Sequence, residues 1–154
     1  MYNFDIPTKL GASPSQDNRG AMTVFYEGDL SSHLIFKMTN SHRGVLRGFH
    51  WQRGSSRQSK LITVISGKIL DVCIRVVEEN LTSNVYVNEL VAGEQIFVPE
   101  NFAHAYLCIH DDTVVTYLCK GKYGDEISFN PLLAWPFWPI NQNDLIISKK
   151  DLLQ

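Results

Sequence analysis

Apolar and polar residues alternate in short stretches along this chain, and turn-forming residues separate the stretches. The alternation is strictest in residues 68–76, where every second side chain is Leu, Val or Ile. A period of two residues is typical of a β-strand with one face buried more deeply than the other. The other stretches of this kind are Leu34–Thr39, Lys60–Ile65, Asn84–Leu90, Gln95–Val98, Ala103–Ile109 and Thr113–Cys119.

At least seven short strands with no long amphipathic helix between them predict an all-β fold, mainly antiparallel and with little helix. A jelly roll of the cupin type, a double-stranded β-helix, is favoured because such a barrel can hold a ligand inside. Polar side chains that share a strand face with apolar ones fit this interpretation, since burying an unpaired polar group is costly. These residues are Lys60, Asp71, His104 and Tyr117.

The two ends of the chain follow a different pattern. Residues 1–30 contain several glycines and two prolines, which predicts loop and an edge strand. Residues 131–154 are aromatic, rich in proline and irregular, with room for a short helix within residues 143–153. The length of 154 residues predicts a single domain, residues 1–154, with one core.

Charge and composition exclude several classes of partner. The net charge is −2, from 14 basic and 16 acidic residues, so the chain has no basic excess with which to bind nucleic acid or an anionic membrane, which leaves room only for a local basic pocket. No signal-peptide pattern and no stretch of about 18 apolar residues occurs. Three cysteines in apolar stretches, Cys73, Cys108 and Cys119, predict reduced core residues. Together these features predict a cytoplasmic protein.

The densest polar segment covers residues 40–60. His50 has no second histidine two positions away, and no glutamate lies between Glu27 and Glu78, so the ligand set of a metal-binding cupin is missing. Basic residues stand where such a glutamate would lie. No metal site is therefore expected, and Arg47, Arg57 and Lys60 favour a phosphate-bearing ligand.

The motifs in this segment and beyond it resemble one enzyme family. Gly44–Gln52 (GVLRGFHWQ) and Gln58–Leu61 (QSKL) are followed in order by short matches along nearly the whole chain. These are Asp17-x-Arg19-Gly20, Gly67-x-x-x-Asp71-Val72, Val98-Pro99-x-x-Phe102-Ala103-His104, Tyr117 with Tyr123, Trp135-Pro136 and Ser148-x-x-Asp151. The set resembles the dTDP-4-dehydrorhamnose 3,5-epimerase family of nucleotide-sugar epimerases.

The resemblance implies a jelly-roll homodimer that uses no metal or organic cofactor. It also implies roles for four residues: His50 as the catalytic base, Asp151 as the carboxylate that orients it, Lys60 at the enolate oxygen, and Tyr117 as the acid on the opposite face of the sugar. The remaining implied ligand-binding or supporting positions are Arg19, Arg47, Gln58, Asp71, His104 and Tyr123. Arg19 is implied to reach the diphosphate of the neighbouring subunit.

These residue types suit the chemistry. A proton beside a ketone is weakly acidic, so its removal needs a base with a near-neutral pKa and a cation at the developing oxyanion. Inversion then needs a separate acid on the other face. Strict alternation would place Arg47 and His50 on opposite faces, so a bulge or strand end is predicted at Gly48. Taken alone, Tyr117 would be interpreted as a core residue and Arg19 as a solvated one.

The predicted function is epimerisation at carbon 3, carbon 5 or both of a nucleotide-diphosphate 4-keto sugar. Two alternatives stay open: a 3,4-ketoisomerase and a non-catalytic ligand-binding cupin. Ala21–Val24 stands where the family has aromatic residues and a glutamate that contact thymidine, so the sequence leaves the nucleotide base open.

Overall fold

The structure is a computed structural model that describes residues 5–10, 15–17, 20–22 and 33–153. Most of these residues form antiparallel strands, and helix is limited to α1 (Pro131–Ala134), α2 (Lys149–Leu152) and two short 3₁₀ turns, at Gly54–Ser56 and Gln142–Asp144. The predicted all-β fold with little helix is confirmed. The strands are β1 (Thr8–Leu10), β2 (Ser15–Asp17), β3 (Gly20–Met22), β4 (Leu34–Ser41), β5 (Val45–Gln52), β6 (Ser59–Ser66), β7 (Lys68–Val77), β8 (Asn80–Val91), β9 (Gln95–Val98), β10 (Phe102–Cys108), β11 (Thr113–Lys120), β12 (Glu126–Ser128) and β13 (Ile146–Ile147).

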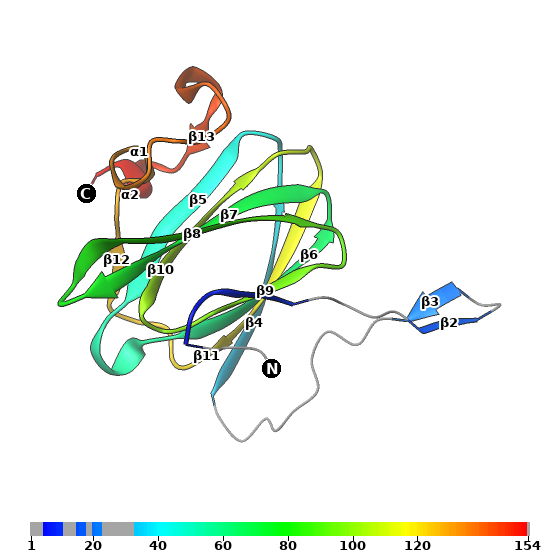
Figure 1. The fold of residues 1–154 in the computed structure, drawn as a ribbon, viewed down its shortest axis with the longest axis horizontal. Helices are drawn as coiled ribbons and strands as arrows, with labels where there is room; N and C mark the ends of the chain where they lie inside the picture. The colour runs from blue at the N-terminus through cyan, green and yellow to red at the C-terminus, as the bar shows by residue number, and fades with distance from the viewer. Residues whose placement is uncertain (1–4, 11–14, 18–19, 23–32, 154) are drawn as a thin grey trace.

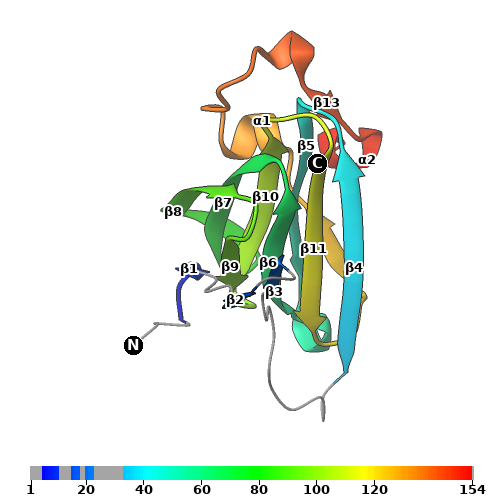
Figure 2. The same cartoon turned by 90° about the vertical axis from the view of Figure 1, so that its right-hand side faces the viewer.

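Two sheets lie face to face and enclose the core (Figures 1 and 2). The first sheet has the order β1-β9-β6-β11-β4, and the second has the order β12-β5-β10-β7-β8, with β13 added in parallel beside β5. From β4 to β12 the chain crosses to the other sheet at every connection except the β7–β8 hairpin. This alternation gives the jelly-roll arrangement, in which residues distant in sequence share one interior.

The interior is packed by apolar side chains from both sheets. Ile62 and Val64 from β6 meet Ile69 and Cys73 from β7, all without exposed surface. Each fully buried side chain of this kind contributes about 1.5–3 kcal/mol to folding. Three polar residues, Lys60, Asp71 and His104, are buried in the same space, as the shared strand faces indicated.

A second apolar cluster covers the outer face of the second sheet. Phe49 and Trp51 of β5 point to this side, and the C-terminal segment packs over them through Trp138 and Ile140. Trp138 also donates a hydrogen bond from its indole to the Pro131 carbonyl oxygen, at 3.1 Å. The predicted short helix in residues 143–153 is confirmed as α2, whereas β13 was not anticipated.

The predicted irregularity at Gly48 is confirmed. Pairing between β5 and β10 shifts by one residue, from His50 opposite His104 to Arg47 opposite Tyr106. Gly48 has φ +110°, and a Cβ atom there would lie 2.4 Å from the His104 carbonyl oxygen. Only glycine fits this close approach, which lets Arg47 and His50 line the same cavity.

The described part of the N-terminal segment lies at the edge of the fold, whereas the cysteines lie inside it. β1 pairs with β9 at the edge of the first sheet, in the segment for which the sequence predicts loop and an edge strand. Figure 1 shows β2 and β3 as a two-stranded sheet that stands apart from the two larger ones. All three cysteines are buried and free. None of the helices in the described ranges is long and apolar enough to cross a membrane.

Candidate active site

A cavity of about 490 Å³ opens between the two sheets at the end of the barrel where α2 lies. Its wall carries four cationic side chains and two carboxylates. The excess of positive charge favours an anionic ligand, as expected from the sequence. The charged residues are Lys37, Arg47, Lys60, Lys150, Glu126 and Asp151.

Most of the residues implied by the sequence motifs meet in this cavity. Asp71, Gln58 and Tyr123 do not line it, and Arg19 lies outside the described residues. Asp71 lies directly behind His104, while the Tyr123 side chain is 58% exposed. The six that line the cavity are Arg47, His50, Lys60, His104, Tyr117 and Asp151.

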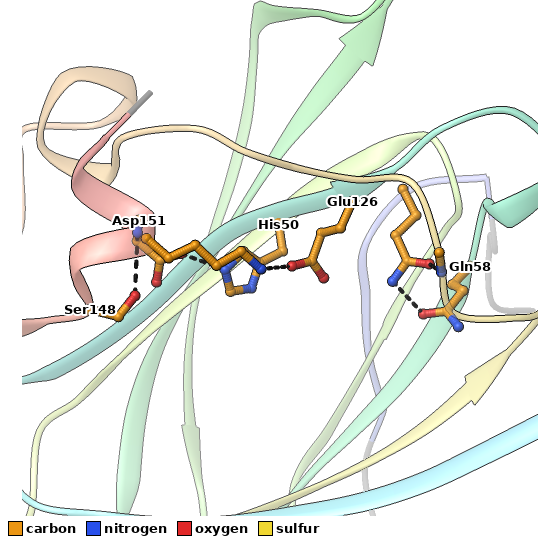
Figure 3. A network of polar contacts seen from close by, with 8 residues as sticks. His50, Gln58, Glu126, Ser148 and Asp151 are labelled. Carbon is orange, nitrogen blue, oxygen red and sulfur yellow. Dashed lines mark hydrogen bonds and ion pairs between the residues drawn. The ribbon is translucent and has the colours of Figure 1, made fainter.

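His50 and Asp151 form a hydrogen-bonded pair although 101 positions separate them in sequence. His50 Nε2 lies 2.7 Å from Asp151 Oδ1 (Figure 3). Asp151 sits in α2, whose N-cap Ser148 accepts a hydrogen bond from the Asp151 backbone N–H. Burial alone would raise the Asp151 pKa, but hydrogen bonds from His50, Ser148 and the Gly48 backbone outweigh it and lower the pKa. The carboxylate is therefore ionised at neutral pH and can stabilise a protonated imidazole.

Lys60 presents a buried ammonium group to the cavity. It is 8% exposed, and no carboxylate within the described ranges forms a salt bridge with it. Burial, together with the nearby Lys37 ammonium, lowers the pKa of Lys60 from its ordinary value, and the Glu126 carboxylate partly offsets this. A desolvated cation without a bound counterion is suited to stabilise a negative charge that develops on a ligand.

Tyr117 faces the cavity from the wall opposite His50. It belongs to β11 of the first sheet, whereas His50 belongs to β5 of the second. Burial, together with the Tyr106 hydroxyl, raises the pKa of Tyr117 well above its usual value. The Tyr106 hydroxyl oxygen itself lies 2.8 Å from Thr39 Oγ1. Tyr117 therefore keeps its proton at neutral pH and can act as a hydrogen-bond donor or an acid.

His104 is held from behind by a buried carboxylate. Its Nε2 lies 2.5 Å from Asp71 Oδ2, and Cys73 Sγ donates to Asp71 Oδ1 at 3.3 Å. These three side chains have donor atoms within 4.8 Å of one another, the spacing of a metal site. Here the donor atoms instead hydrogen-bond to each other. Burial and the Asp71 charge raise the Cys73 pKa well above normal, so the thiol is not a thiolate ligand.

Arg47 and Gln58 are fixed by uncharged partners. Arg47 donates from Nε and Nη2 to Ser41 Oγ, at 3.2 and 3.1 Å. Gln58 donates to the Gly121 carbonyl oxygen and accepts from Gln52 Nε2, both at 3.0 Å. Gln58 thus supports Gln52, which does line the cavity.

Three charged cavity residues were not identified from the sequence. Lys37 of β4 lies with its ammonium 5.5 Å from the centre of the Tyr117 ring and 5.9 Å from that of Tyr123. Glu126 of β12 forms an ion pair with Lys150 of α2. Lys150 could have been suspected because it precedes Asp151, whereas Glu126 lies in a three-residue strand with no clear alternation.

Comparison with known proteins gives a consistent result. The sequence model of the dTDP-4-dehydrorhamnose 3,5-epimerase family matches residues 8–154. A dTDP-4-dehydrorhamnose 3,5-epimerase from Methanothermobacter thermautotrophicus is 36% identical over 139 residues, covering 83% of this chain and 74% of that protein. A relative of the same name from Neisseria gonorrhoeae is 32% identical over 88% of this chain, which spans only 45% of that longer protein.

Comparison of the folded structure with solved structures identifies the same family. The crystal structure of a Bacillus anthracis dTDP-4-dehydrorhamnose 3,5-epimerase with TDP and PPi bound superimposes with a TM-score of 0.85 at 25% identity. The match covers 99% of this chain and 95% of that one.

Proposed function

The chain belongs to the dTDP-4-dehydrorhamnose 3,5-epimerase family, and from that premise we propose how its barrel inverts a sugar carbon. It is an epimerase that acts on a dTDP-linked 4-keto-6-deoxy sugar. The observation that carries the mechanism is the placement of His50, which is paired with Asp151 of α2, and Tyr117 on facing sheets, with the Lys60 ammonium buried beside the same cavity.

His50 removes the proton next to the ketone. Its imidazole takes the proton at the ring nitrogen not bound to Asp151, and the ionised Asp151 stabilises the resulting positive charge. Electrons from the broken C–H bond move to the carbonyl oxygen and form an enolate. Lys60 donates a hydrogen bond to this oxygen, and a buried ammonium group does so more effectively than one in water.

Tyr117 completes the inversion. It delivers its proton to the enolate carbon from the wall opposite His50, so the carbon receives its new hydrogen on the other face. His104, held by Asp71, contacts the sugar. No step in this sequence requires a metal or an organic cofactor.

The diphosphate is bound by the cationic side of the cavity. Arg47 offers a planar guanidinium that can form two hydrogen bonds with a phosphate. Gln58 acts from behind the wall of the site by holding Gln52, and Tyr123 acts through its exposed ring, which lies beside Lys37. Ala21–Val24 stand at the positions from which the family contacts the nucleotide base, and their side chains are not among those described.

Deuterium wash-in tests the proposed function. Incubating the protein in D₂O with dTDP-4-keto-6-deoxyglucose should introduce deuterium at the carbons beside the ketone, together with inversion seen by NMR. The expected result is exchange without migration of the carbonyl group. A ketoisomerase would instead move the carbonyl, and a binding protein would give no exchange, so either result would contradict the proposal.

We also propose that the enzyme is a homodimer. Phe36 and Met38 of the edge strand β4 are 71% and 66% exposed, which is unfavourable for an isolated subunit. Pairing of subunits through this side would cover them. In such a dimer the segment that contains Arg19, between β2 and β3, reaches the neighbouring subunit and binds the diphosphate there.

Mixing subunits tests the role of Arg19. Arg19→Ala should raise KM far more than it lowers kcat, because the contact is remote from the reacting carbon. If Arg19→Ala and His50→Asn subunits exchange, mixed dimers contain one site with both defects and one with neither, so activity should return. The exposed Arg43→Ala should behave like the unaltered enzyme. Failure to recover activity despite measured subunit exchange, or a monomer in sedimentation at assay concentration, would refute the proposal.

A further inference from the structure

Two side chains, Asp71 and His104, connect Cys73 to the cavity. Cys73 is directly opposite His104 in the β7–β10 pairing, and its Sγ lies 3.3 Å from Asp71 Oδ1. The other carboxylate oxygen, Oδ2, is bound to His104 Nε2. His104 lines the cavity, whereas Asp71 and Cys73 are fully buried and do not. Any influence of Cys73 on a ligand therefore passes through Asp71 and His104.

The Cys73 thiol donates to Oδ1 of Asp71, the carboxylate oxygen that His104 does not contact. A buried carboxylate needs a hydrogen-bond donor at each oxygen, because an unsatisfied charged oxygen away from water is costly. With both oxygens engaged, the Asp71 carboxylate has one orientation, which in turn fixes the ring plane of His104. Burial keeps the pKa of Cys73 far above neutrality, so the thiol retains the proton that it donates.

A metal ion held by the same three side chains is the competing interpretation. It would have to displace the thiol proton and break the short His104–Asp71 contact. The buried Lys60 ammonium lines the same cavity as His104, and its charge would repel a cation. The arrangement therefore favours a hydrogen-bonded relay over a metal centre.

We propose that Cys73 is a positioning residue, which holds Asp71 by a hydrogen bond and through it orients His104 toward the sugar. This inference rests on the proposed function for its effect on catalysis. The relay itself, Cys73 to Asp71 to His104, is a property of the folded protein and can be observed without substrate.

Three substitutions separate the hydrogen bond from packing. Cys73→Ser keeps a donor, Cys73→Val fills the site with a larger apolar side chain that has no donor, and Cys73→Ala removes the donor and leaves the space unfilled. We expect Cys73→Val and Cys73→Ala to lower kcat about tenfold with KM little changed, since a misplaced group in a catalytic site costs rate. Cys73→Ser is expected to stay within about twofold of the unaltered enzyme.

NMR of the histidine ring provides a readout that packing alone would not move. The low-field N–H signal of His104, assigned by its loss in His104→Asn, should shift in Cys73→Val and persist in Cys73→Ser. An unchanged signal and unchanged kcat in Cys73→Val would overturn the proposal, as would equal impairment of the Ser and Val variants. Tight Zn²⁺ binding that Cys73→Ala abolishes would favour the metal centre instead. Absence of deuterium wash-in by the unaltered enzyme would count against the proposed function, while the ring signal would still test the relay.

Discussion

Replacing His50 by asparagine is expected to abolish deuterium wash-in and to lower kcat by roughly 10²–10⁴-fold, the usual contribution of a general base. Asparagine preserves the polarity and approximate size of the side chain but cannot accept a proton at neutral pH. The structure gives the reason for a large effect: the imidazole is bound to Asp151 at 2.7 Å, and the pair faces the cavity. Binding of dTDP should be retained, because the cations of the cavity are unchanged.

The control for this change is His42→Asn. The His42 side chain is 80% exposed on the turn before β5, so this variant should exchange deuterium at the normal rate. Asp151→Asn should lower the rate of wash-in less than His50→Asn does, because the imidazole remains but its protonated form loses the Asp151 carboxylate. Normal wash-in by His50→Asn would remove His50 from the mechanism.

The strand pattern could be predicted because each strand has one face toward an apolar interior. The stretch at 68–76 became β7, and the turn residues around Glu78 and Glu79 lie at positive φ between β7 and β8. The C-terminal segment could not be predicted in the same way. Its aromatic residues carry no period, and only the packing of Trp138 against Phe49 in the folded protein shows which surface they cover.

The candidate site was partly predictable for a similar reason. His50 and Arg47 lie in a motif that resembles the family. Strict alternation would place them on opposite faces of the strand, and this conflict itself indicated the irregularity at Gly48. Lys37 and Glu126 carried no such signal, because a charged residue on a short or edge strand is ordinarily solvated. Their place in the cavity follows from how the two sheets meet, which residue spacing does not encode.

Replacing Tyr117 by phenylalanine is expected to separate proton removal from inversion. The inverted sugar should form roughly 10²–10⁴-fold more slowly, since the acid on the first sheet is lost. Wash-in should continue, because His50, Asp151 and Lys60 are intact and His50 can return a solvent deuteron to the face from which it took the proton. NMR of the recovered substrate should therefore show deuterium beside the ketone with the original configuration.

This outcome depends on the two walls of the cavity having different roles. Tyr86→Phe is the matched control, since Tyr86 is a half-buried tyrosine packed edge-on against Phe102 and outside the cavity. It should invert the sugar normally. Inversion at the normal rate by Tyr117→Phe would make Tyr117 a core residue, as its apolar strand alone would indicate. Loss of both exchange and inversion would mean that Tyr117 already acts when the first proton leaves, so base and acid would not divide the reaction between the facing sheets.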